Sequence, residues 1–370
     1  MEPMSLKKLL EQYLSLVKKL LPEKEGSFAV GIDIGFHSCK MVEISKAGNA
    51  YQLNSFAIEP VVDGNIAQAI KAVLAKAKKP NKSPYTSVFG KGTLIRCLPM
   101  PRMTLEDLKK SLAIEADKYF PFAQDQIYTD CFILDSSGED KRIPVLVAAS
   151  KKEIIDARVK LLTDLGLHTN FITLNPIAVA NVLYVLGSSG AAEKKEPAGQ
   201  VAPASAASSG VAILDMGETV SNLTILVGRL PRFTRDIFLG GQDLNKRISN
   251  ALGISLQEAE KLKRQPPKDK LTEILNACDS SLTNLISEMR LSFDYFTTEN
   301  NLHISKLLLT GGASMLEGMK DYFTKNLDIP AENLNPLSLF QIAEDVSQEE
   351  LKKNATRLSV AIGLALYHYD

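Results

Sequence analysis

The sequence predicts an α/β protein whose two halves repeat one hairpin and share one ligand site. Residues 30–44 and 212–226 follow the same pattern: an apolar run, Asp-x-Gly, a few small or polar residues and a second apolar run. Apolar runs on both sides of a glycine are typical of strand–turn–strand. A third segment, residues 304–310, is strand-like and ends in Gly311-Gly312. Two hairpins and a Gly-Gly turn in this order predict a duplicated fold that holds a polyphosphate from both sides.

Each hairpin places an aspartate at the end of its first strand. Asp33 and Asp215 occupy these positions, and Gly35 and Gly217 follow two residues later. The turn N–H groups form a nest that suits phosphate, and glycine lets the backbone approach it because there is no Cβ. The alternative is that each aspartate caps its own turn. The paired context favours the ligand site.

The third segment predicts a helix start after its strand. Ser314 is followed three residues later by Glu317, which is the pattern of a capping box, and residues 315–323 are amphipathic. A strand, a Gly-Gly turn and a helix N-terminus leave an uncluttered backbone surface for a flat base and a ribose. Standing alone, the segment would be an ordinary loop between a strand and a helix.

Composition excludes several classes of protein. The 370-residue chain balances 43 Lys and Arg against 43 Asp and Glu, so no nucleic-acid partner is expected. Its length suffices for two domains. The four cysteines form no CxxC and the four histidines no ligand-spaced cluster, which suits reduced thiols and argues against a transition-metal site. No apolar run approaches the roughly 18 residues of a transmembrane helix.

Two segments stand outside the halves. Residues 1–25 predict an N-terminal amphipathic helix closed by Pro22. Three roles stay open for it: an interfacial membrane helix, a helix docked on its own body, or a helix for a partner groove. In residues 188–209, sixteen of the 22 positions are Ala, Gly, Ser or Pro. Such a segment cannot bury enough apolar surface to order itself, and it predicts a flexible linker.

The remaining chain divides into units. The first half is predicted over residues 27–86 and 150–187, interrupted by an inserted module at 87–149; the second half spans 210–348, and residues 350–370 hold a last helix. In the first half we expect strands, helices at 65–78 and 152–165, a strand at 171–174 and a helix after Pro176. In the module we expect strands at 87–98, 127–134 and 143–149 and a helix at 104–119, capped by Thr104 with Asp107. The last helix is expected at 356–369.

The motifs carry a specific resemblance. Asp33-x-Gly35 with Lys40, Asp215-x-Gly217-x-Thr219 and Leu309-Thr310-Gly311-Gly312-Ala313 resemble the phosphate-1, phosphate-2 and adenosine motifs of the actin-like ATPase superfamily. Within it, residues 115–122 and 286–296 resemble the PilM family of type IV pilus assembly proteins, which is related to FtsA. The resemblance covers residue 27 to the C-terminus. It implies a duplicated actin-like, ribonuclease-H-like fold with an FtsA/PilM-type inserted subdomain, whose last helix packs back on the first half.

The resemblance implies ATP and Mg²⁺ as ligands. Asp33 would lie near the magnesium, through water, and Asp215 would be the other metal-side carboxylate and the catalytic residue. Lys40 would reach the phosphates as a point charge. Further phosphate donors would come from Ser38 and from the backbone of residues 35–37 and 217–219, which includes Gly35, Gly217 and Thr219.

The nucleoside would lie on the second half. Gly311, Gly312 and Ala313 would bind the adenosine, and Gly241 begins a helix beside the cleft. Glu260 and Lys263 match an FtsA-like pattern that holds the ribose. The alternative is that this Glu–Lys pair at helical spacing is only a solvated pair.

Three departures from the superfamily pattern affect hydrolysis. Phe36 and His37 stand where a serine or threonine is common; Asn222 stands where actin has a histidine; Asn175 replaces the glutamate of a Glu-Pro pair. A neutral amide cannot accept a proton as a carboxylate does. We therefore expect a nucleotide-binding switch with slow or absent turnover.

The resemblance also implies a place in pilus assembly and twitching motility. It implies a cytoplasmic, nucleotide-dependent adaptor at the inner-membrane platform, which meets pilus platform and motor proteins and binds the N-terminal cytoplasmic peptide of a PilN-like single-span protein. A peripheral membrane contact and a homo-oligomer are compatible with it. The peptide groove would lie between the inserted module and the first half, and at least one of Tyr119, Phe120 and Phe122 should line it.

Two other functions are weighed. An FtsA-like membrane-tethered filament former is the stronger rival, although FtsA has its membrane helix at the C-terminus and the helix here is N-terminal. A sugar or acetate kinase shares the fold but needs a catalytic carboxylate poised on a substrate hydroxyl and a substrate-pocket motif, and the sequence shows neither.

Overall fold

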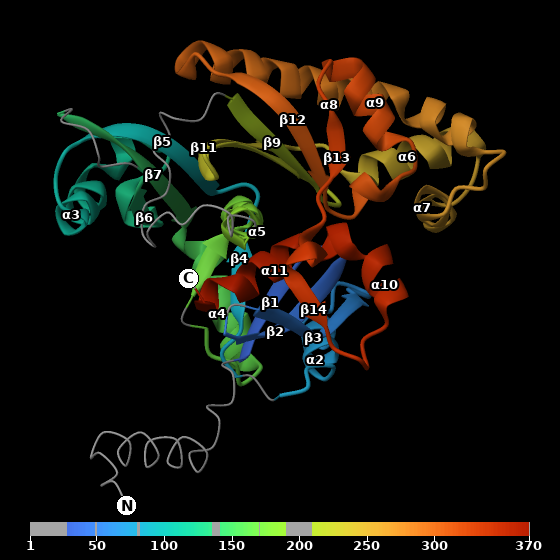
Figure 1. The fold of residues 1–370 in the computed structure, drawn as a ribbon, viewed down its shortest axis with the longest axis horizontal. Coiled ribbons are helices and arrows are strands. Elements are labelled where there is room, and N and C mark those ends of the chain that lie inside the picture. The colour runs from blue at the N-terminus through green and yellow to red at the C-terminus, as the bar shows by residue number, and fades with distance from the viewer. Residues whose placement is uncertain are drawn as a thin grey trace, which may run out of the picture.

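The computed structural model describes residues 28–48, 50–79, 82–134, 141–169, 171–189 and 209–369. The expected N-terminal helix at 1–25 and nearly all of the expected linker at 188–209 lie outside these residues. Figure 1 shows two α/β lobes, one above the other, with a smaller module at their side. Within the described ranges, no helix has the length and apolar character needed to cross a membrane.

The first lobe is a six-stranded sheet in the order β14-β3-β2-β1-β4-β8. Its strands are β1 (Phe28–Ile34), β2 (Ser38–Ala47), β3 (Ala50–Pro60), β4 (Tyr85–Val88), β8 (Ile172–Leu174) and β14 (Phe340–Ile342). Helices α2 (Ile66–Leu74) and α4 (Lys152–Asp164) cover one face. Helices α5 (Asn175–Ser189) and α11 (Ser359–Leu366) cover the other. With both faces covered, β1 is an uninterrupted apolar run up to Asp33.

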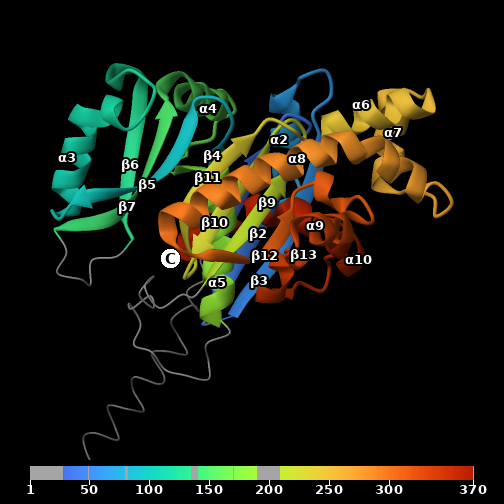
Figure 2. The ribbon, with the colours of Figure 1, turned by 90° about the horizontal axis from the view of Figure 1, so that it is seen from above.

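The second lobe is a five-stranded sheet in the order β11-β10-β9-β12-β13. Its strands are β9 (Ser209–Met216), β10 (Ser221–Val227), β11 (Leu230–Ile237), β12 (His303–Thr310) and β13 (Ala331–Asn333). Its helices are α6 (Gly241–Leu252), α7 (Leu256–Arg264), α8 (Leu271–Asn300) and α9 (Met319–Leu327). Seen from above, α8 runs across this sheet (Figure 2), and its apolar side chains enter the core of the lobe. Helix α10 (Gln348–Lys353) follows β14.

The small module is a three-stranded sheet covered by one helix. The strands run in the order β5-β7-β6, as β5 (Thr93–Pro101), β6 (Ile127–Ile133) and β7 (Arg142–Lys151), beside α3 (Leu105–Glu115). Thr104 caps α3 by accepting a hydrogen bond from the N–H of Asp107, as predicted. The single strand predicted over 87–98 is wrong. The chain turns at Gly90 and Gly92, both at positive φ, so Ser87 belongs to β4 in the large sheet.

Helices α5 and α11 cross between the two large sheets. Their apolar side chains contact the first sheet on one side and the second on the other. At the crossing, a Cβ on Gly363 would lie 1.8 Å from the carbonyl oxygen of Ala178, so only glycine fits. The last helix packs on the first lobe as predicted, but its α-helical part is shorter than 356–369 because 3₁₀ turns flank it.

Two helix boundaries differ from the prediction. Helix α9 begins at Met319 after Gly318, not at Ser314. The Ser314 side chain is buried inside the 3₁₀ turn Ala313–Met315, where its hydroxyl donates to the carbonyl of Gly311. Helix α2 ends at Leu74 rather than at Lys78.

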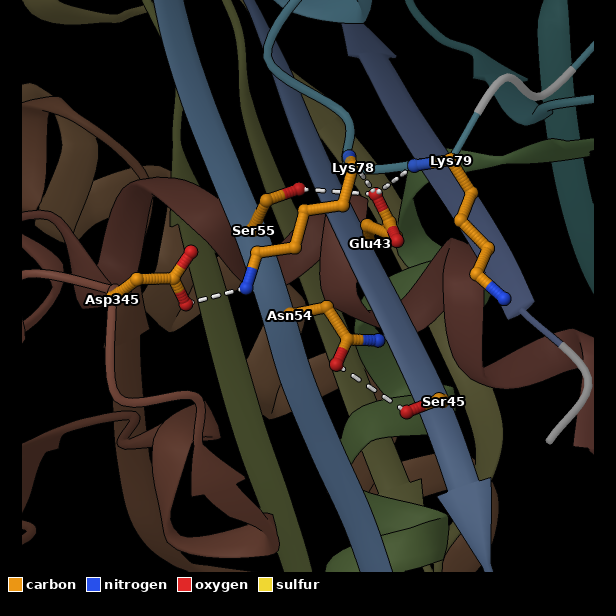
Figure 3. A network of polar contacts seen from close by, with 7 residues as sticks. All are labelled: Glu43, Ser45, Asn54, Ser55, Lys78, Lys79 and Asp345. Carbon is orange, nitrogen blue, oxygen red and sulfur yellow. Dashed lines mark hydrogen bonds and ion pairs between the residues drawn. The ribbon is translucent and has the colours of Figure 1, made fainter. Parts of the chain in front are cut away.

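A buried carboxylate explains the early end of α2. Glu43 on β2 is fully buried, and its Oε2 accepts hydrogen bonds from the backbone N–H groups of Lys78 (2.6 Å) and Lys79 (3.5 Å) and from the Ser55 hydroxyl (3.2 Å) (Figure 3). These amides would otherwise extend the helix. The Lys78 ammonium then pairs with Asp345 at 2.5 Å, which joins this segment to the chain after β14.

Candidate functional site

The three predicted turns line one cleft between the lobes. The cleft is narrow, with a cavity volume of about 90 Å³. Of the predicted site residues, the cleft is lined by Asp33, Gly35, Ser38, Lys40, Asp215, Gly217, Thr219, Glu260, Lys263, Gly311, Gly312 and Ala313. Gly241 lies just behind the wall, where its carbonyl accepts a hydrogen bond from the Lys263 ammonium at 3.1 Å.

Asp33 and Lys40 face each other because the first hairpin pairs them directly in register. The Lys40 ammonium lies 2.9 Å from Asp33 Oδ2, and both side chains are largely buried. The hairpin therefore places one cation and one carboxylate side by side at the cleft wall.

Asp215 enters the same space from the second hairpin. Its strand, β9, lies between β10 and β12. In the sheet, Asp215 is paired with Asn222 of β10 and with Thr310 of β12. Burial, together with the negative charge of Asp33, raises the pKa of the Asp215 carboxyl to about 7, although the charge of Lys40 lowers it. The carboxylates of Asp33 and Asp215 thus act on each other and on the same ammonium, that of Lys40.

Two glycines allow the backbone to come close to the carboxylates. Gly311 has a φ of 86°, and a Cβ there would lie 2.5 Å from Asp215 Oδ1. A Cβ on Gly217 would lie 2.7 Å from the carbonyl oxygen of Val220 and block the hairpin turn. Both turns therefore need glycine to keep their shape.

Glu260 and Lys263 form part of a buried network, so the alternative of a solvated pair is wrong. Lys263 is 3% exposed, and its ammonium lies 2.6 Å from Glu260. Asn245 donates to the same oxygen, Oε2, at 2.7 Å, and Arg264 contacts the other oxygen, Oε1, at 2.6 Å. Burial would raise the pKa of Glu260, but Lys263, Asn245 and Arg264 more than offset it and lower this pKa to about 2.

Sequence reasoning missed two arginines in the cleft. Arg264 follows the predicted Glu–Lys pair on α7, and Arg357 comes from the 3₁₀ turn Ala355–Leu358 that precedes α11. Burial, together with the charge of Arg264, lowers the pKa of Arg357 to about 10. No motif surrounds Arg357. It reaches the cleft because Gly311 N–H donates to the carbonyl of Thr356 at 3.0 Å.

The residues at the water-activating positions are neutral or apolar. The Asn222 amide donates to Asp236 at 2.5 Å. Asn175 is buried at the start of α5, and its Oδ1 has no hydrogen-bond partner in the part of the chain that the structure describes. Phe36 is 64% exposed at the cleft wall, with its ring edge-on to Phe89.

A second, more apolar groove lies between the small module and the first lobe. It has a cavity volume of about 530 Å³ and is lined by β6, β7, β8, α5, the start of β11 and the C-terminal turn. The expectation that one of Tyr119, Phe120 and Phe122 lines this groove is wrong, because all three pack in the core of the module. The aromatic rings in the groove are those of Tyr128, Phe132, Phe171, Tyr184 and Tyr367.

Two facing α/β lobes, a β-hairpin turn from each and a glycine turn between them define the actin-like ATPase fold. The solved structure of the ethanolamine utilization protein EutJ from Carboxydothermus hydrogenoformans shares it, with a TM-score of 0.51 and 15% identity over 98% of this chain and 100% of that one. The chain belongs to the family of the type IV pilus assembly protein PilM, whose model matches residues 31–369. A solved PilM–PilN type IV pilus biogenesis complex is similar to it, with a TM-score of 0.79 and 25% identity over 92% of this chain and 98% of that one.

Proposed function

We propose that this protein is an ATP-binding adaptor of type IV pilus assembly. It acts at the cytoplasmic face of the inner membrane, and the bound nucleotide changes its affinity for a membrane partner. The observation that carries the proposal is the meeting of Asp33, Lys40 and Asp215 in one cleft with three glycine-containing turns.

The residues present fit a magnesium nucleotide. Lys40 can exchange its carboxylate partner for phosphate. The N–H groups of Gly35 and Gly217 close their own turns, so the donors for phosphate would come from the following turn residues, 36–38 and 218–219. Asp33 and Asp215 would hold Mg²⁺ through its bound waters, and the ion would neutralise negative charge on the phosphates. Glu260 and Lys263 would hold the ribose.

Alanine at Asp33 or Lys40 is expected to weaken ATP binding at least about tenfold, or about 1.4 kcal/mol. Each substitution removes one member of the pair that faces the phosphates. Calorimetric titration with Mg·ATP measures the affinity, and Lys71→Ala, an exposed lysine on α2 of the same lobe, is the matched control. Unchanged affinity in both cleft variants would overturn the site assignment.

The apolar groove is the proposed partner site. The similar solved complex joins PilM to PilN. By analogy, the inserted module of residues 87–149 and the first lobe would receive the N-terminal cytoplasmic peptide of a PilN-like protein. The edge strand β6 supports this, because its residues line the groove and it pairs only with β7 among the described strands. An extended peptide can place alternate side chains in such a groove.

Phe132→Ala is expected to cost the peptide about 1–3 kcal/mol of binding free energy, as a hot-spot ring does. Phe132 lines the groove and is 58% exposed, so its loss should leave the fold intact. Titration with the first dozen or so residues of the PilN-like protein measures the effect. Ile114→Ala is the control, since Ile114 is 69% exposed on α3 of the same module and lies outside the groove. Equal binding by both variants would place the partner elsewhere.

A further inference from the structure

Two helices reach both the cleft and the apolar groove. Helix α5 begins with Asn175 in the cleft and carries Tyr184 in the groove. Helix α11 is preceded by Arg357 in the cleft and followed by Tyr367 in the groove. The cleft is therefore lined at the start of both helices, whereas the groove is lined by α5 from Ile177 to Tyr184 and by the turn after α11.

The two helices are interlocked at their crossing. Gly363 of α11 touches the backbone of Ala178 so closely that no Cβ fits between them. The Asn181 amide of α5 donates to the carbonyl of Gly363 at 3.1 Å, and both residues are buried. A shift of α11 at this point must carry α5 with it, because tightly packed elements move as units.

The cleft end of α11 is attached to the glycine turn of the second lobe. The carbonyl of Thr356 accepts hydrogen bonds from Gly311 N–H at 3.0 Å and from the Thr310 hydroxyl at 2.8 Å. The next residue, Arg357, places its guanidinium in the cleft, where the similarly charged Arg264 repels it. Arg264 is already paired with Glu260 at 2.6 Å, whereas the Arg357 guanidinium donates to the neutral Asn354 Oδ1 at 2.8 Å. Arg357 is therefore the cation on this wall that favours an anionic or π-rich ligand.

We propose that Arg357 contacts the bound nucleotide and that α11, interlocked with α5, transmits this contact to the partner groove. The inference rests on the proposed function, because it requires that Mg·ATP binds in the cleft. By linkage, a ligand in the groove changes the affinity for Mg·ATP by the same factor as Mg·ATP changes the affinity of that ligand.

A tryptophan introduced in the groove tests the coupling. The chain contains no tryptophan, so Tyr184→Trp gives a single reporter on α5. Mg·ATP is expected to change its emission and to slow hydrogen exchange of the backbone amides of residues 359–366. Calorimetry on the same protein measures ATP binding independently.

Arg357→Ala and Arg357→Lys are compared in the reporter background at saturating Mg·ATP. Both variants should bind Mg·ATP, but Mg·ATP should change neither the tryptophan emission nor the hydrogen exchange. Alanine removes the guanidinium, and lysine keeps its charge but not its planar fork of donors. Arg96→Ala is the control: it removes an exposed arginine on β5 that lines neither the cleft nor the groove, and it should keep both changes once saturated.

The outcomes separate the two claims. An absence of ATP binding in the unsubstituted protein would overturn the proposed function, and this inference with it. ATP binding without a change in emission or exchange would overturn the coupling alone. Full changes in either saturated Arg357 variant would show that the coupling does not pass through its guanidinium.

Discussion

We expect the Asp215→Asn variant to be more stable than the natural protein at pH 8 in metal-free buffer. Burial and the charge of Asp33 raise the pKa of the Asp215 carboxyl from 3.8 to about 7, against the effect of Lys40. Between these pH values the folded chain keeps a proton that the unfolded chain has released, so the free energy of unfolding falls as the pH rises. Above pH 7 the carboxylate of Asp215 is ionised and its destabilising effect is complete. Asparagine carries no charge at any pH, so the variant does not have this destabilisation.

Urea unfolding at pH 5 and pH 8 checks this expectation. The stabilisation gained by Asp215→Asn should be about 2 kcal/mol larger at pH 8 than at pH 5. Asp321→Asn, on the exposed face of α9, is the control and should change stability by less than about 0.5 kcal/mol at either pH. A gain that does not grow with pH would show that Asp215 is already ionised at pH 5.

The same variant should bind Mg·ATP at least about tenfold more weakly at pH 8. A neutral amide lacks the charge that holds the waters of Mg²⁺. In the natural protein, Asp215 would then destabilise the protein when the cleft is empty and stabilise it when Mg·ATP is bound. This combination is typical of binding sites.

The cleft could be predicted because its determinants are local in sequence. Asp33 and Lys40 are joined by one short turn, and a hairpin with that turn sets them opposite each other. The glycine turn after β12 follows its strand directly. Strand ends and turns therefore placed the carboxylates, the lysine and the glycines without knowledge of the tertiary structure.

Arg357 and Glu43 could not be predicted, because their positions depend on contacts distant in sequence. Arg357 enters the cleft only through the hydrogen bonds between Thr356 and the turn after β12. Glu43 lies in an otherwise apolar strand and ends α2 by binding the backbone amides of Lys78 and Lys79. Neither role leaves a pattern near the residue.

Three other predictions are wrong at segments whose own sequence or local structure explains the difference. Gly90 and Gly92 lie within the supposed strand 87–98, and glycines at such positions are typical of turns. The prediction that at least one ring of Tyr119, Phe120 and Phe122 lines a groove is wrong, because all three rings belong to the core of the small module. Ser314 has the spacing of a helix cap, but it lies in the 3₁₀ turn Ala313–Met315, and α9 begins only at Met319.

We expect turnover of bound ATP to stay below about one per minute, far under the typical enzyme rate near 10 s⁻¹. Asn222 is engaged by Asp236, and Asn175 presents only a neutral amide oxygen at the cleft, so neither can take a proton from water. Phosphate release under saturating Mg·ATP measures the rate. Asn175→Glu should raise it about tenfold or more, because it supplies a general base at this position, whereas Asn300→Glu, at the distant end of α8, should not. A natural rate near 10 s⁻¹ that Asp215→Asn abolishes would instead identify an efficient ATPase with Asp215 as its catalytic residue.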